Sequence, residues 1–191
     1  MKITGNPKQD EATRRLLEEG TRSYLDAMNA LIAYRQEVQK TCRTVLETYV
    51  DDYASALKVS LKSSEIRDAE SPPFTAWKGD HWALGVKIVR EKITPTIRWW
   101  ETWCHLHNEA GDNGLCCCID EWYPSKQLAA AVHRKFHALN KKVVHSGKDV
   151  FLYHSFPVEE ICNLQAHLEA ILQQWIGLWT EVGGIKNIAE V

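Results

Sequence analysis

The stretch that decides the fold covers residues 8–67 and reads KQDEATRRLLEEGTRSYLDAMNALIAYRQEVQKTCRTVLETYVDDYASALKVSLKSSEIR. It contains no proline and one glycine, Gly20. Its apolar residues recur every three or four positions, which is typical of a helix with one buried face. One helix of this length would reach roughly 80–90 Å, far more than the diameter of a compact domain of this size. The pattern therefore predicts either a helical hairpin or a long helix that needs a partner.

The apolar stripe of this stretch supplies the candidate interface. Arg35 and Gln39 interrupt it near its middle, where a polar pair either sets the register of paired helices or marks a turn of the face toward solvent. We expect charge substitutions at Leu31 and Val45 to dissociate an oligomer, unless the helix instead covers one face of a sheet. The residues predicted to carry assembly are Tyr24, Met28, Leu31, Val38, Val45 and Tyr49.

A change of pattern follows the helical stretch. Residues 68–73 read DAESPP, and two prolines end a helix because the residue before a proline avoids the α region. We therefore expect a helical arm over 1–67, a proline-containing linker over 68–80 and a second domain over 81–191.

The second domain shows strand patterns first and helical patterns later. Residues 81–88 alternate between apolar and other side chains, residues 96–104 are rich in β-branched and aromatic residues, and short strands are predicted over 115–119 and 150–154. Helices are predicted from Ser125 to about His145 and from about Pro157 to Val182. The predicted class is α+β, a long N-terminal helix or helical hairpin followed by a small antiparallel sheet with two helices. The alternative is an all-α bundle, with a helix over 81–107 kinked at Pro95.

Composition narrows the class of protein. The chain of 191 residues is 45% hydrophobic with a net charge of −2, and its apolar runs are too short to predict a transmembrane helix. No secretory signal pattern is visible at residues 1–10. Six cysteines, three of them adjacent at 116–118, do not resemble a disulfide framework. We expect reduced thiols in a cytoplasmic protein.

A set of metal-binding residue types falls on two predicted strands. If Leu115 pairs with His107, then Cys117 faces His105 and Glu121 faces Glu101, which would gather imidazoles, a thiol and carboxylates suited to zinc or iron. The hypothesis depends on register, because a slip of one residue moves Cys117 and Glu121 to the other face. No cofactor is otherwise predicted. The residues concerned are His105, His107, Cys117 and Glu121 as ligands, with Glu101 as a candidate general base.

Tryptophan is concentrated in the same region, since six of the eight fall between Trp77 and Trp122. Trp82, Trp99 and Trp103 could line a ligand pocket, because tryptophan offers a large apolar face and an N–H donor. The competing interpretation is ordinary packing of a small sheet, since strands select aromatic residues.

Residues 123–148 carry six Lys or Arg and no Asp or Glu. Arg134, Lys141 and Lys142 could meet phosphates, although no nucleic-acid motif accompanies them. The alternative is that the block complements the acidic last helix. His133 and His137 share one side of the same helix, where a solvated polar flank is the simpler interpretation because no catalytic glutamate accompanies them.

The leading functional hypothesis is a non-enzymatic interaction module that forms a homodimer or binds another protein, with nucleic acid and membrane disfavoured as partners. The second hypothesis is a metal-dependent hydrolase that uses Glu101, His105 and His107. The third is an anion or nucleic-acid binder acting through the basic helix, with an affinity that falls steeply with salt.

Overall fold

The computed structural model describes residues 6–70, 84–90, 100–108 and 114–189. The chain divides into two compact units, residues 1–37 and residues 38–191, and each is described here by itself. Helix α1 (Pro7–Leu57) supplies the described part of the first unit and continues into the second.

The long N-terminal stretch is one helix and not a hairpin. Pro7 is its first residue, a position where the missing N–H and fixed φ of proline are favourable. Asn6 caps the helix, because its Oδ1 accepts a hydrogen bond from the Lys8 backbone N–H at 3.1 Å. The helix ends at Leu57, and the next residue, Lys58, has a positive φ of 57°.

The second unit is built on a six-stranded antiparallel sheet with the order β1-β2-β3-β4-β6-β5. A short 3₁₀ turn, η1 (Ser63–Glu65), precedes the first strand, and a second, η2 (Val158–Asn163), follows the last. The strands are β1 (Ile66–Glu70), β2 (Leu84–Arg90), β3 (Trp100–Asn108), β4 (Gly114–Trp122), β5 (Val143–Ser146) and β6 (Asp149–Pro157).

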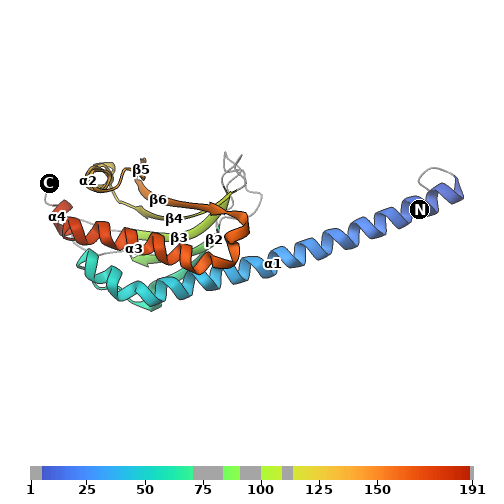
Figure 1. Cartoon of the computed structure of the whole chain (residues 1–191), viewed down its shortest axis with the longest axis horizontal. Coiled ribbons are helices and arrows are strands. Elements are labelled where there is room, and N and C mark those ends of the chain that lie inside the picture. The colour runs from blue at the N-terminus through green and yellow to red at the C-terminus, as the bar shows by residue number, and fades with distance from the viewer. Residues whose placement is uncertain (1–5, 71–83, 91–99, 109–113, 190–191) are drawn as a thin grey trace. The chain divides into compact units, whose positions relative to one another are not determined.

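Helices lie on one face of this sheet. The second part of α1 (38–57) and helix α3 (Leu164–Val182) run side by side there, and α2 (Lys126–Leu139) packs against β5 and β6 (Figure 1). A short helix, α4 (Lys186–Ala189), closes the described chain. Val86, Ile119 and Leu152 lie at successive positions across the sheet and are fully or almost fully buried beneath these helices.

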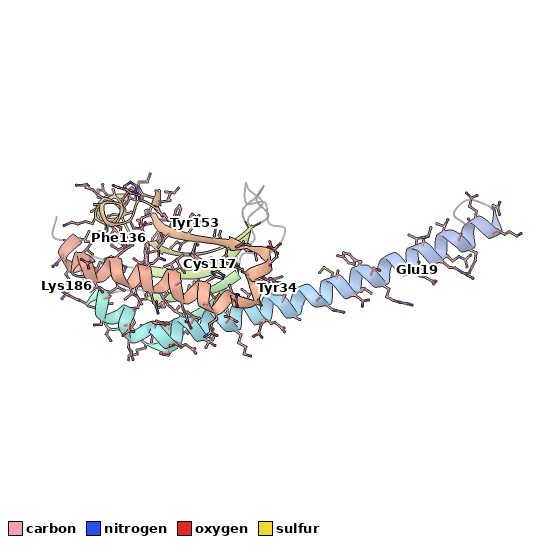
Figure 2. The ribbon with its side chains drawn as sticks, in the orientation of Figure 1. Glu19, Tyr34, Cys117, Phe136, Tyr153 and Lys186 are labelled. Atoms are coloured by element: carbon pink, nitrogen blue, oxygen red, sulfur yellow. The ribbon has the colours of Figure 1, made fainter. Side chains whose placement is uncertain are left out.

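Aromatic side chains fill the space between the helices. Phe136 of α2 packs edge-to-face on Trp175 and Trp179 of α3, with ring centroids 5.1 and 4.9 Å apart. Figure 2 shows Phe136 on α2, with Cys117 in the sheet. Burial of such large rings is a main source of folding free energy for a core of this size.

The α+β class is confirmed, with differences in detail. The sheet has two strands more than predicted, β1 and β5, and β1 lies where the linker over 68–80 was expected to begin. Residues 71–80 lie outside the described part. Helix α2 ends at Leu139 and not at His145, because Val143–Ser146 pairs with β6. The division between the units falls at residues 37 and 38, so it does not coincide with the boundary expected at 67.

Candidate functional site

The first part of α1 carries a stripe of exposed apolar side chains. Of the eight large hydrophobic residues that are exposed in the described chain, five lie on this part of the helix: Leu16, Leu17, Tyr24, Leu25 and Ile32. Tyr24 is 63% exposed and Leu17 56% exposed. Glu19, labelled in Figure 2, lies on the same part of the helix but away from the stripe by its helical phase. We take these five residues, together with the partly exposed Met28, as the helical stripe.

The residues predicted for the interface differ in their exposure in the structure. Tyr24 is exposed and Met28 partly exposed, whereas the side chain of Leu31 lies outside the described part. Val38 and Val45 are each 1% exposed in the core of the second unit, so placing them in an interface was wrong. Their face of α1 covers the sheet, which was the stated alternative.

Tyr49 belongs to the second unit and is partly buried. Its hydroxyl accepts a hydrogen bond from Gln173 Nε2 at 2.8 Å, which ties α1 to α3. Leu16, Leu17, Leu25 and Ile32 are exposed on the same part of the helix but were not among the predicted interface residues. A stripe wider than one residue per turn could have indicated them.

The register between β3 and β4 differs from the one that the metal hypothesis needs. Leu115 lies opposite Asn108 and not His107, a slip of one residue. Cys117 is therefore opposite Leu106, and Glu121 is opposite Thr102. Because residues directly opposite each other share a face, Cys117 and Glu121 do not pair with His105 and Glu101, and the expected arrangement was wrong. The side chains of Glu101, His105 and His107 themselves lie outside the described part.

Glu121 instead lies at the centre of the helix-covered core. Its side chain is fully buried, and four donors from three elements surround the carboxylate. The Nε1 atoms of Trp175 and Trp179 each donate to Oε1 at 3.0 Å, and the hydroxyls of Tyr53 and Tyr123 donate to Oε1 and Oε2. We call these five side chains the Glu121 cluster.

The electrostatics of the cluster are set by burial. Desolvation raises the pKa of Glu121 to about 7, against the opposing effect of the hydrogen bonds from Tyr123, Trp175 and Trp179. Burial also raises the pKa of Tyr123 well above its usual value, with the charge of Glu121 adding to the shift. The cluster has no route to solvent through its own side chains, because Glu121, Tyr53 and Tyr123 are 0% exposed. It can join α1, β4 and α3, but it does not present a reactive group to a substrate.

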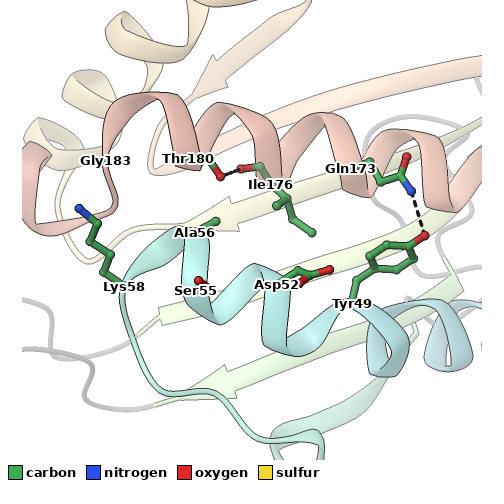
Figure 3. A pocket seen from close by; sticks show the side chains of 9 residues that line it. All are labelled: Tyr49, Asp52, Ser55, Ala56, Lys58, Gln173, Ile176, Thr180 and Gly183. Atoms are coloured by element: carbon green, nitrogen blue, oxygen red, sulfur yellow. Dashed lines mark hydrogen bonds between the residues drawn. The ribbon is translucent and has the colours of Figure 1, made fainter.

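A shallow groove of about 490 Å³ runs between the second part of α1 and α3 (Figure 3). Its polar lining includes Asp52, Lys58 and Thr180, and the Tyr49–Gln173 hydrogen bond lies within it. The hydroxyl of Thr180 is bonded to the Ile176 carbonyl oxygen of its own helix at 2.9 Å. The lining therefore shows polar surface without a convergent set of ligand-binding groups.

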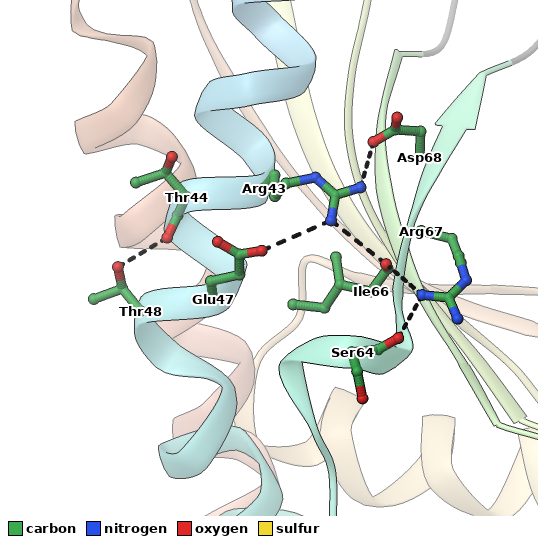
Figure 4. Close-up of polar contacts among 8 residues, drawn as sticks. All are labelled: Arg43, Thr44, Glu47, Thr48, Ser64, Ile66, Arg67 and Asp68. Atoms are coloured by element: carbon green, nitrogen blue, oxygen red, sulfur yellow. Dashed lines mark hydrogen bonds and ion pairs between the residues drawn. The ribbon is translucent and has the colours of Figure 1, made fainter.

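An ion pair holds β1 against α1 (Figure 4). Arg43 Nη2 lies 2.6 Å from Asp68 Oδ1, and Arg43 Nη1 lies 3.7 Å from Glu47 Oε1. The hydrogen bond with Asp68 raises the pKa of Arg43. Because Asp68 is 62% exposed, we assign this pair a role in positioning β1 and only a small contribution to stability.

Two groups of histidines lie at helix–strand contacts. His133 of α2 lies between His137 and His145, with ring centroids 5.1 and 5.4 Å away, and burial lowers the pKa of His133. His154 Nε2 of β6 lies 3.0 Å from His167 Nδ1 of α3. Within the described residues, no three His, Cys, Asp or Glu side chains are placed to hold a metal ion.

The residues predicted to bind anions lie at the α2–β5 end of the second unit. Arg134, Lys141 and Lys142 are all exposed. Lys148 of the same basic block instead lies over the Trp122 ring, 4.8 Å from its centroid. Anion binding by the exposed cations stays a prediction, as does their pairing with the acidic last helix.

The predicted tryptophan pocket cannot be assembled from the described residues. Trp82 and Trp99 lie outside them, and for Trp103 the structure gives only its strand position opposite Lys87 and Asp120. Trp175 and Trp179, which fall within the helix predicted from about Pro157 to Val182, instead donate hydrogen bonds to Glu121.

Comparison with protein-family models, with curated proteins and with solved structures finds no match to this chain. No helix in the described residues is long and apolar enough to cross a membrane.

Proposed function

We propose that the protein is a non-enzymatic interaction module that self-associates through the helical stripe of the first unit. The observation that carries this proposal is the exposure of Leu16, Leu17, Tyr24, Leu25 and Ile32 on one helix. Scattered single apolar residues are ordinary on a protein surface, but five exposed large ones within 17 residues of one helix are a concentration of the kind that marks an interaction site.

The physical chemistry of an isolated helix supports the same conclusion. Among the described residues of the first unit, 7–37 form a single helix, with no second helix or strand against which to bury an apolar face. A helix of this kind is marginal in water without tertiary packing. Burying a leucine or similar side chain contributes about 1.5–3 kcal/mol, so pairing several of these residues would stabilise both the helix and the assembly.

The two parts of α1 differ in the exposure of their apolar side chains. In the first unit the apolar side chains are exposed, whereas Val38, Cys42 and Val45 are buried in the core of the second. The second unit therefore buries the apolar side chains of its own part of α1, and we assign the helical stripe of the first unit to a partner.

The test is native mass spectrometry and light scattering of the intact protein beside a Leu17→Glu/Leu25→Glu variant. We expect the wild type to be an oligomer and the variant to be a folded monomer, because two carboxylates would be buried at the interface. The matched control is Ala30→Glu/Ala33→Glu, which adds the same charge on the opposite, polar side of the helix and should keep the native mass. A wild type that is monomeric at all accessible concentrations, or a test variant that keeps the oligomeric mass, would refute the proposal.

A further inference from the structure

Leu17, Tyr24 and Met28 of the helical stripe follow a seven-residue repeat, whereas Leu16, Leu25 and Ile32 lie outside it. Leu17, Tyr24 and Leu31 recur seven residues apart, and Thr21, Met28 and Arg35 form a second column four residues after them. Alternating steps of four and three residues are the pattern of a two-column coiled-coil seam. Extended toward the N-terminus, the two columns reach Asp10 and Arg14.

Charges in the seam distinguish the two ways in which identical helices can pair. In a parallel pair, each seam residue faces its own copy, so Arg14 would face Arg14 and Arg35 would face Arg35. Like charges in direct contact at an interface are destabilising. A parallel homodimer would therefore carry two repulsive arginine layers in a seam of about four heptads.

We infer that two copies pair antiparallel over residues 10–35, with the two-fold axis between Arg22 and Ser23. This inference rests on the self-association proposed above. In this register the two columns face each other, so Met28 meets Leu17 and Tyr24 meets Thr21. Arg35 of one copy comes opposite positions 10 and 11 of the other. The same contacts repeat on both sides of the two-fold axis, as a symmetric dimer requires.

The charges at positions 10 and 11 are complementary to Arg35. Asp10 is 5% exposed in the single chain, so the more accessible partner is Glu11, whose side chain is 55% exposed. Glu11 Oε1 lies 3.3 Å from Arg15 Nε on its own helix. An exposed pair of this kind is weak and readily shared with a second cation.

The remaining surface of the helix fits this pairing. Arg15, Glu19, Arg22 and Asp26 lie on the side opposite the helical stripe by helical phase, and all are exposed. They would stay in water in the dimer. The attachment points of the two second units, at residue 38 of each copy, would lie at opposite ends of the paired segment.

Distances between spin labels on the two copies measure the relative orientation of the paired helices directly. A label at Ala12→Cys is placed in a Cys162→Ser background, which removes the thiol that is exposed among the described cysteines. It should give an intermolecular separation of about 32 Å along the helix axis in the antiparallel dimer, from 21 residues at 1.5 Å each. A parallel dimer would give almost no axial separation. The Cys162→Ser protein without Ala12→Cys corrects for labelling of other cysteines.

Mixing the Ala12→Cys and Ala33→Cys proteins should give the opposite result for the distance between the labels. Positions 12 and 33 are related by the proposed two-fold axis, so only the mixed sample should add a shorter distance, one with almost no axial separation. Short distances in the single-site sample, and none added by mixing, would overturn the antiparallel arrangement while leaving self-association intact.

Charge exchange tests the contact at the ends of the seam. We expect Arg35→Glu to weaken the dimer by about tenfold, because both symmetric contacts become repulsive. Adding Glu11→Lys should restore the affinity to within about threefold of wild type, as measured by sedimentation equilibrium. Arg22→Glu, the same charge change on the outer side, is the control. Failure of Glu11→Lys to restore affinity would refute the register, whereas a monomeric wild type would refute both the dimer and the proposed function.

Discussion

At the scale of single residues, Glu121 is the most unusual side chain of the second unit. A carboxylate is rarely fully buried, because the charged form loses its hydration. Here four donors from tyrosine and tryptophan side chains compensate part of that loss. The raised pKa of about 7 shows that desolvation outweighs them.

This shift predicts a specific pH dependence of stability. The pKa of Glu121 rises from 4.5 in its ordinary state to about 7 in the fold, so the folded protein binds the proton more tightly than the unfolded chain. The contribution of the group is therefore largest below pH 4.5 and declines as the pH rises toward 7, by at most about 1.4 kcal/mol per pH unit.

The comparison that isolates this effect is wild type against Glu121→Gln, measured by urea unfolding from pH 5 to pH 8. At pH 5 we expect the variant to be less stable by about 1–3 kcal/mol, because its amide group presents donors to a ring of donors. The difference should shrink as the pH rises, because only the wild type must ionise a buried group. Glu181→Gln, at an exposed position of α3, is the control, and an unchanging difference between wild type and Glu121→Gln would contradict the assignment.

At the scale of elements, the end of α3 is fitted closely to the end of α1. Gly183 and Gly184 follow the helix with φ of 78° and 89°. The Ile185 backbone N–H then donates to the Leu57 carbonyl oxygen at 3.2 Å. A Cβ at position 184 would lie 2.9 Å from that same oxygen, so both the backbone conformation and the space select glycine.

Two glycine substitutions, expected to change the free energy of unfolding in opposite directions, test this junction. Gly184→Ala should lower the free energy of unfolding by about 1–3 kcal/mol, since it combines an unfavourable φ with a close contact. Gly177→Ala, within α3 where a Cβ meets nothing within 4 Å, should raise it by up to about 1 kcal/mol. Thermal and urea unfolding measure both. Equal effects would mean that the junction does not constrain position 184.

At the scale of the whole molecule, the two units draw on one helix in different ways. Residues 38–57 bury most of their apolar side chains within the second unit, while Leu16, Leu17, Tyr24, Leu25 and Ile32 are exposed. A continuous helix can thus belong to a core over one part of its length and serve as a surface over another. The amphipathic pattern is the same in both parts, and only the neighbouring elements differ.

This division predicts the behaviour of a shortened chain. We expect residues 38–191 alone to unfold cooperatively, with a midpoint that does not depend on protein concentration. The full chain should show a midpoint that rises with concentration, because the proposed association would stabilise only the folded helix. Calorimetry over a hundredfold range of concentration distinguishes the two. A fragment that is unfolded would show that the first unit is needed for the core.

Part of the fold followed from local patterns. The repeat of three and four residues in 8–67 indicated a helix, which in the structure ends earlier, at Leu57. The strand patterns near β2, β3, β4 and β6 indicated an antiparallel sheet. Strands β1 and β5 were missed because Ile66–Glu70 and Val143–Ser146 are short and only partly apolar, and their pairing partners supply most of their stabilisation. The register of strand pairing could not be predicted from the local pattern either, because a shift of one residue leaves the sequence of each strand unchanged.

Local periodicity was enough to predict a long amphipathic helix followed by an antiparallel sheet, since helix and strand periodicities are properties of neighbouring residues. Which apolar residues of that helix are buried and which remain exposed was decided by the packing of the folded chain. The same packing also decided that Glu121 joins tyrosines and tryptophans in the core and not histidines in a metal site. Both outcomes depend on contacts between residues far apart in the chain, such as Tyr53, Glu121 and Trp175, and no local pattern encodes which distant side chains will meet.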